Sequence, residues 1–175
     1  MSTSASSSAA LSISHVVLRI LIIVNWVCGA AILTLLVFLP TRQWIMSSLD
    51  LSPSQEAERV IMGLRTVAII GIASVPLYYA ILKRMLAIVE TVRAGDPFVA
   101  ANARRLRAIA WALFALQLLS LVVGMINKVI STPGHPIDLD AGFSINGWIA
   151  VLLTFVLAHV FAQGTRMRDD LEGTV

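Results

Sequence analysis

Four long runs without a charged residue limit what this chain can fold into. An α-helix needs about 20 apolar residues to cross a hydrocarbon core of about 30 Å. The shortest run is flanked by Arg65 and Lys83, whose long side chains can carry their charges to the membrane surface. The sequence therefore predicts four membrane spans, at about residues 16–40, 60–82, 108–128 and 146–164.

The composition agrees with an all-α integral membrane protein. Hydrophobic residues make up 58% of the 175 residues and charged residues 13%, whereas soluble domains are about a quarter charged. We predict a single four-helix bundle over residues 14–165, with short outer-face loops and no separate soluble domain. The segment 1–13 is small, polar and uncharged, which predicts disorder, and residues 166–175 form a charged tail.

Basic residues are divided unevenly between the two sides of the predicted bundle. Lysines and arginines near the ends of membrane helices tend to stay in the cytoplasm. One side carries nine of them and the other carries four. The nine are Arg19, Lys83, Arg84, Arg93, Arg104, Arg105, Arg107, Arg166 and Arg168, and the four are Arg42, Arg59, Arg65 and Lys128. Both termini and the segment 83–107 are therefore predicted to be cytoplasmic.

The segment 83–107 is typical of a helical hairpin that extends the second and third spans into the cytoplasm. Each arm has apolar residues on one helical face and charged residues on another. Gly95 predicts the end of the first arm. Asp96 is a good N-cap for the second arm, and Pro97 a good first helical residue, because proline lacks only an amide that would be unpaired there. We expect the two arms to pack along their apolar faces.

The sequence carries no recognisable catalytic motif. It contains no HExxH, GxSxG, Walker or dinucleotide-binding fingerprint, and no pair of carboxylates falls within a span. We therefore predict no enzymatic activity and no cofactor. His15 and His159 map near the inner interface, where a shared metal or haem site is conceivable. Two histidines without a local motif favour interhelical hydrogen bonding instead.

Two other functions stay open. A small transporter or channel subunit would need a continuous polar path through the mid-span polar residues, which are Asn25, Ser74, Gln117 and Thr154. A lipid-binding or stress-sensing protein would need a lateral pocket near Arg105 and His159. Membrane lipids are expected partners in any case, because an arginine at headgroup depth is attracted to anionic lipids by about 1 kcal/mol.

The tail has a basic start and an acidic finish. Its acidic residues are Asp169, Asp170 and Glu172, and the nearest predicted basic group is Arg104, Arg105 and Arg107 on the second arm of the hairpin. We hypothesise that the two groups pair. The tail and the hairpin would then form one cytoplasmic surface, either clipped together or presented to a protein partner.

Two stretches resemble the signatures of a known family. GDPFVAANARRLRAIAW is similar to the PF-xxx-N-xx-RLR signature, and FAQGTRMRDDLEGTV to the ending, of the YoaS-like bacterial inner-membrane proteins, whose function is unknown. FSIN before the fourth span is also similar. The matching residues are Pro97, Phe98, Asn102, Arg105, Leu106 and Arg107, then Phe161, Gly164, Met167, Asp170, Thr174 and Val175. Gln163 and Gly173 depart from the pattern, which has acidic and bulky apolar residues there.

The resemblance implies four inner-membrane helices with both signatures in the cytoplasm. Members are often encoded beside a small helix-turn-helix regulator, which implies a membrane partner that modulates or sequesters a DNA-binding protein, without direct binding of nucleic acid by this chain. A homo-oligomer stays open. The residues predicted to bind the partner are Asp96, Pro97, Phe98, Asn102, Arg104, Arg105, Arg107, Gly164, Arg168, Asp169, Asp170, Glu172, Thr174 and Val175.

Overall fold

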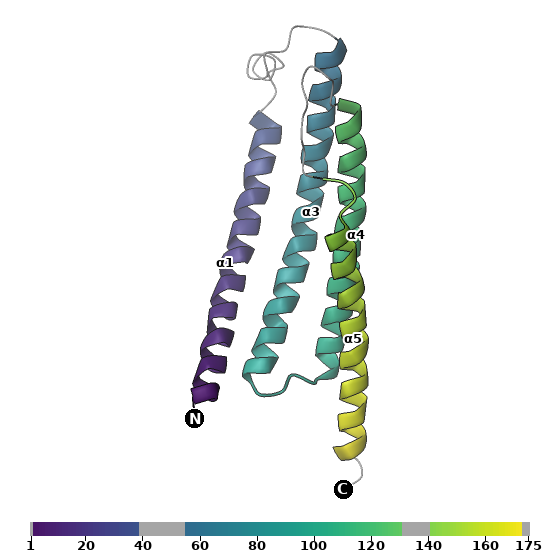
Figure 1. Ribbon diagram of the computed structural model, residues 1–175. Coiled ribbons are helices and arrows are strands. Elements are labelled where there is room, and N and C mark those ends of the chain that lie inside the picture. The colour runs from purple at the N-terminus through teal and green to yellow at the C-terminus, as the bar shows by residue number, and fades with distance from the viewer. Residues whose placement is uncertain (1, 39–54, 131–140, 173–175) are drawn as a thin grey trace. The chain divides into compact units, whose positions relative to one another are not determined.

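The computed structural model describes residues 2–38, 55–130 and 141–172, and the regular structure among them is helical throughout (Figure 1). The helices are α1 (Ser2–Phe38), α3 (Gln55–Arg93), α4 (Ala100–Ile130) and α5 (Ile145–Glu172). Each contains a stretch long and apolar enough to cross a membrane, namely Leu11–Val37, Ile61–Arg93, Ala100–Val129 and Ile145–Arg168. The prediction of an all-α chain with four spans is confirmed, and it indicates a multi-pass membrane protein.

Helix α1 is longer than the sequence suggests. It already begins at Ser2, so residues 2–13, for which composition predicts disorder, continue the helix of the first span. Adding a residue to an existing helix gains one hydrogen bond for each residue fixed, and the alanines and serines here cost at most about 0.5 kcal/mol each in propensity. The predicted outer-face loops fall largely on residues 39–54 and 131–140, which lie outside the described residues.

The chain divides into two compact units. The first comprises Met1–Asn25, Leu77–Ala115 and Ile145–Val175, and the second comprises Trp26–Pro76 and Leu116–Ser144. All nine basic residues that the sequence assigns to the cytoplasmic side fall in the first unit, beside five acidic residues, so its net charge is +4. The second unit has four basic and five acidic residues and a net charge of −1. The charge asymmetry that predicts the orientation is therefore also a difference between the two units.

The second unit packs through small residues. A Cβ atom added to Gly29 of α1 would lie 3.1 Å from the methyl groups of Val75 on α3, so the two helices are close there. The segment before α5 lies against α4: the amide of Gly142 donates to Ser120 Oγ over 3.2 Å, and the Ser120 hydroxyl donates to the Gly142 carbonyl over 3.1 Å. A Cβ on Gly124 would meet the Gly142 Cα at 2.5 Å. Glycine is thus required where this connection crosses α4.

The core of the first unit follows helical spacing. On α5 the buried side chains recur every seven residues, or about two helical turns, at Val151, Ala158 and Thr165, and on α4 they are Asn102, Leu106, Ile109, Ala110 and Ala112. Ring contacts also join α4 to α5, because Trp111 meets Phe155 edge to face at a centroid distance of 5.4 Å. Many other apolar side chains are exposed in the structure, as expected for helices whose outer faces meet lipid.

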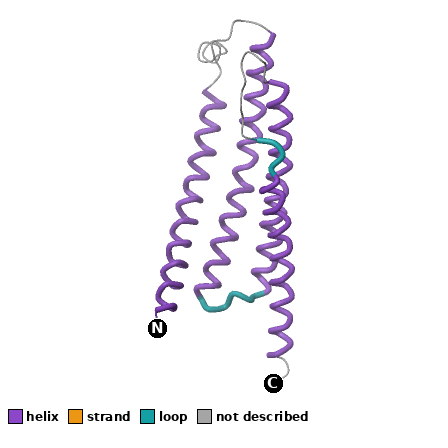
Figure 2. The backbone as a smooth tube through the Cα atoms, in the orientation of Figure 1, coloured by secondary structure: helices purple, strands orange, loops and turns teal. Residues whose placement is uncertain are grey.

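The turn that joins α3 to α4 is a short loop, visible between the two helices in Figure 2. Gly95 ends α3 as predicted, with a positive φ of 84° that glycine adopts without strain. The amide of Gly95 donates to the Val92 carbonyl and that of Asp96 to the Thr91 carbonyl. These two bonds form a Schellman motif, which satisfies carbonyls left open at the end of a helix.

The predicted start of the second arm is wrong. Asp96 and Pro97 do not begin α4, whose first residue is Ala100. The physical reason is that both residues have other partners: the Asp96 carboxylate pairs with Arg168, and the Pro97 carbonyl accepts a hydrogen bond from the Asn102 side chain over 2.9 Å. A rule for local capping does not include these competing contacts.

Candidate functional site

Asn102 lies at the centre of a buried hydrogen-bond network within the hairpin. Its side chain is 0% exposed, and its amide nitrogen donates to the Thr91 hydroxyl over 2.7 Å as well as to the Pro97 carbonyl. The Thr91 hydroxyl donates in turn to the Ile88 carbonyl over 2.7 Å. A buried amide requires such partners because an unpaired one costs about 1–3 kcal/mol. Asn102 therefore ties the end of α3, the turn and the start of α4 together.

Arg105 completes this arrangement from the next turn of α4. Its guanidinium donates to the Asn102 side-chain oxygen over 2.7 Å and to the Ala87 carbonyl over 3.2 Å. With the first bond, both the nitrogen and the oxygen of the Asn102 side chain have a partner. The second bond connects α4 to α3. We call Thr91, Pro97, Asn102 and Arg105 the Asn102 network. Its role is to hold the hairpin in one geometry, which places the turn residues between Gly95 and Val99.

One face of α5 lies against that turn. The residues that form this face recur at helical spacing of three and four: Phe161, Gly164, Thr165 and Arg168. The ring of Phe98, from the turn, stacks on the ring of Phe161 at a centroid distance of 5.3 Å and an interplanar angle of 29°. Such an aromatic pair contributes about 0.5–1.5 kcal/mol beyond the area it buries.

Gly164 leaves the space that the Phe98 ring uses. A Cβ atom at this position would lie 3.3 Å from the Phe98 Cδ1 and 3.5 Å from its Cε1. An alanine here would require the ring to shift by a small amount, and a branched side chain would require a larger displacement. The close approach of the Phe98 ring is therefore the physical reason for a small residue at Gly164.

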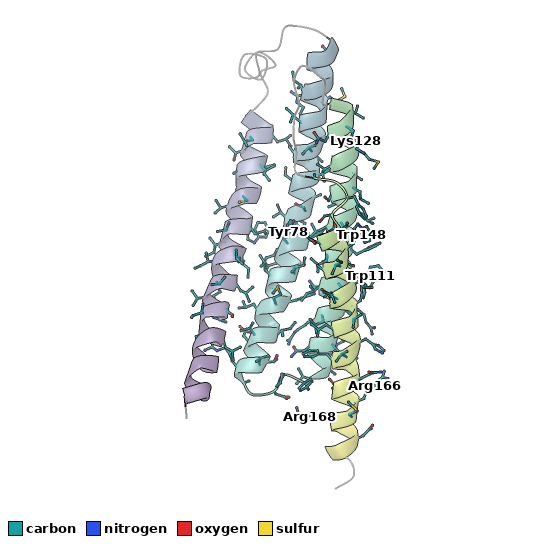
Figure 3. The ribbon with its side chains drawn as sticks, viewed as in Figure 1. Tyr78, Trp111, Lys128, Trp148, Arg166 and Arg168 are labelled. Atoms are coloured by element: carbon teal, nitrogen blue, oxygen red, sulfur yellow. The ribbon has the colours of Figure 1, made fainter. Side chains whose placement is uncertain are left out.

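An ion pair joins the end of α5 to the turn. The Arg168 guanidinium donates to the Asp96 carboxylate, and Figure 3 shows Arg168 at the C-terminal end of α5. The side chains are 45% and 43% exposed respectively. We call Asp96, Phe98, Phe161, Gly164 and Arg168 the hairpin–tail contact. It joins segments of the first unit that are distant in the sequence.

The charges of this contact are the reverse of the predicted ones. The sequence suggests that tail carboxylates pair with hairpin arginines, whereas here the tail supplies the arginine and the hairpin the carboxylate. Arg105 is bound within the Asn102 network, and Arg104 and Arg107 are exposed. Asp170 is exposed on α5. The side chains of Asp169 and Glu172, as well as Thr174 and Val175, lie outside the described residues.

One further polar contact in the first unit was not expected. His15 Nε2 of α1 lies 3.6 Å from Glu90 Oε1 of α3, so His15 meets a carboxylate, and His159 is exposed on α5. The only signal for this contact in the sequence is the predicted position of His15 near the inner interface. Among the residues that the structure describes, no three His, Cys, Asp or Glu side chains gather in a way that could hold a metal ion.

The mid-span hydroxyl groups bond to their own helices. Ser74 donates to the Gly71 carbonyl over 2.6 Å, and Thr154 to the Ala150 carbonyl over 2.7 Å. Serine and threonine commonly satisfy their hydroxyls in this way within membrane helices. These two side chains therefore need no polar partner on a neighbouring helix.

Comparison with known proteins gives one match. A family model described as "Protein of unknown function (DUF2975)" matches residues 30–175, which include the end of α1, the whole of α3, α4 and α5, and every residue of the hairpin–tail contact. No curated protein matches the chain. No solved structure matches it either.

Proposed function

The chain belongs to the DUF2975 family of proteins of unknown function, and from that premise we propose that its hairpin and C-terminal tail form one cytoplasmic surface that binds a soluble protein. The partner we propose is a small helix-turn-helix transcriptional regulator, which the membrane protein sequesters or modulates. In this proposal the chain is a bacterial inner-membrane protein without enzymatic activity, and both of its termini are cytoplasmic.

The hairpin–tail contact is the observation that carries this proposal. An anchor needs only apolar spans, and its connecting turn and tail can point freely into water. Here the Phe98 ring is seated on α5 against Phe161 and Gly164, and Arg168 is paired with Asp96. A defined arrangement of the two segments supports the idea that they act as one binding surface, because pre-organised groups lose less entropy on binding.

The charge of the first unit supports a cytoplasmic protein partner. Its nine lysines and arginines, against four in the second unit, fit the positive-inside rule, which would place the hairpin and tail where a soluble regulator could reach them. The choice of a helix-turn-helix regulator rests on the resemblance to the YoaS-like proteins. Direct binding of DNA is not part of the proposal, since arginines at headgroup depth meet lipid phosphates first.

The transporter and lipid-sensing alternatives receive no specific support. Ser74 and Thr154, two of the residues a polar path would use, donate to carbonyls of their own helices. Arg105, which a lateral lipid pocket would use, is bound to Asn102 and to the Ala87 carbonyl. The contacts of these residues are accounted for by packing.

Crosslinking in native membranes followed by affinity purification tests the proposal. We expect the full chain to enrich a soluble helix-turn-helix protein, and a chain truncated after Gly164 to lose it. The truncation removes Arg168 and the rest of the tail but keeps Phe161 and most of α5. Recovery of the same proteins with both chains would contradict a role for the tail, and recovery of only membrane proteins would contradict a soluble partner.

A further inference from the structure

The hairpin–tail contact leaves part of its own surface exposed. Phe98 is 46% exposed although it stacks on Phe161, and Met167, beside Arg168 on α5, is 63% exposed. Phenylalanine, methionine and arginine are enriched in the buried centres of protein interfaces. Phe98, Met167 and Arg168 therefore offer two apolar contacts beside a positive charge, and we call these three residues the docking surface.

Asp96 is the only acidic residue within the segment 94–107, which otherwise carries arginines at 104, 105 and 107. It pairs with Arg168, and close to half of each side chain is open to solvent. An ion pair exposed to this extent contributes about 0.2–1 kcal/mol, so another carboxylate can replace Asp96 at low cost. The Asn102 network does not involve Asp96 or Arg168 side chains, so the hairpin can keep its geometry while Arg168 changes partner.

From this arrangement we propose that the partner binds the docking surface through an acidic amphipathic helix, one of whose carboxylates takes the place of Asp96 on Arg168. Apolar residues of that helix, one turn from the carboxylate, contact Phe98 and Met167. Asp96 then acts as an internal competitor that occupies Arg168 in the free protein. The inference rests on the proposed function, because it specifies the surface and the partner chemistry of that same site.

Two variants, each of which removes one charge of the ion pair, test this arrangement, and the control Arg166→Gln distinguishes it from a simple electrostatic surface. Asp96→Asn removes the competitor, so an acidic helix should bind about two- to fivefold more tightly, the factor that corresponds to a surface ion pair. Arg168→Gln removes the group for which both carboxylates compete, so binding should weaken. The two substitutions change the net charge by one unit in opposite directions, and Arg166→Gln is the matched control for Arg168→Gln because Arg166 is also exposed on α5.

The experiment uses the full chain in nanodiscs of zwitterionic lipid and three synthetic helical peptides. The peptides share leucines at helical spacing and differ at the remaining positions, which carry glutamate, glutamine or lysine. We expect the glutamate peptide to bind at least about tenfold more tightly than the glutamine peptide. Asp96→Asn should tighten the binding of the glutamate peptide. Arg168→Gln should reduce the ratio of affinities for the glutamate and glutamine peptides to below about threefold, whereas Arg166→Gln should leave this ratio above about fivefold.

Several outcomes would overturn the inference. The first is equal affinity for the three peptides, and the second is a lower affinity of the Asp96→Asn variant for the glutamate peptide. The third is an equal loss of affinity for the glutamate peptide in Arg166→Gln and Arg168→Gln. Loss of all peptide binding in nanodiscs with 30% anionic lipid would also do so, because lipid headgroups would then be the natural occupant. The purification from native membranes gives a separate result: if it yields a regulator while these peptide effects fail, the proposed function stands and the exchange on Arg168 does not.

Discussion

The Asn102 network and the hairpin–tail contact share a turn of a few residues but differ in burial. Asn102 is fully buried, and each polar atom of its side-chain amide has a partner within the hairpin. In the hairpin–tail contact, Asp96, Phe98 and Arg168 remain between 43% and 46% exposed. A buried network resists change because each lost bond leaves a desolvated group, whereas an exposed contact can exchange its partner for water or another molecule. The turn and the helices beside it therefore contain both buried residues that hold the fold and residues that remain partly exposed.

The largest expected effect comes from Asn102→Ala. It removes the bonds to Thr91 and Pro97 and leaves the Arg105 guanidinium without its acceptor, so we expect the free energy of unfolding to fall by about 3 kcal/mol. Thermal unfolding in detergent measures the change. Asn146→Ala is the control, because Asn146 is exposed at the start of α5 and its loss should change the stability by less than about 0.5 kcal/mol. Equal stability of the two variants would contradict a structural role for the network.

Gly164→Val should have a smaller, local effect. The added side chain would displace the Phe98 ring from α5, which removes an aromatic pair worth about 1 kcal/mol. We expect faster tryptic cleavage after Arg166 and Arg168, and no change in the amide hydrogen exchange of the turn. Gln163→Val, an exposed position next to Gly164, is the control and should cleave at the wild-type rate. Unchanged cleavage in Gly164→Val would show that the ring does not hold the tail.

The ion pair between Asp96 and Arg168 should contribute least to stability among these contacts. A double-mutant cycle with Asp96→Asn and Arg168→Gln should give a coupling energy of about 0.2–1 kcal/mol, because both side chains are close to half exposed. Thermal unfolding at 50 mM and 500 mM salt measures it, and the coupling should fall at the higher salt concentration through screening. A coupling above about 2 kcal/mol that is insensitive to salt would place this pair with the buried network.

Arg104→Gln is expected to leave the stability unchanged to within about 0.5 kcal/mol, since Arg104 is exposed whereas Arg105 is bound within the Asn102 network. The comparison variant Arg105→Gln should lose about 1.5–3 kcal/mol, the contribution of hydrogen bonds from a charged group. Thermal unfolding of the two variants measures the separate contributions of these adjacent arginines to stability, which the sequence does not distinguish. Similar losses for both would contradict the assignment of Arg105 alone to the network.

The four spans and the end of α3 could be predicted from the sequence, because each depends on local physics. A run of apolar residues has few alternatives to crossing the membrane, and Gly95 adopts the positive φ that ends a helix. The start of α4 could not be predicted in the same way. Asp96 and Pro97 satisfy the local rule for a cap, but Arg168 pairs with the Asp96 carboxylate and the Asn102 side chain bonds to the Pro97 carbonyl instead.

The candidate site shows the same limit. Its charged residues are visible in the sequence, yet their pairing depends on how α4 and α5 are rotated about their axes. A rotation of one residue, about 100°, decides whether Arg104 or Arg105 faces inward, and two residues separate Arg166 from Arg168. The face of α5 that contains Phe161, Gly164 and Arg168 has the right spacing, but the residues it contacts in the turn become known only from the structure.

The most direct test of the central claim asks whether the turn and the tail are in contact in a native membrane. Phe98 is replaced by p-benzoylphenylalanine, which keeps an aromatic ring at the position that stacks on Phe161, and the purified chain is digested after irradiation. We predict an intramolecular crosslink to residues 161–168, which Gly164→Val should reduce. Crosslinks only to lipid, or to other segments of the chain, would contradict it.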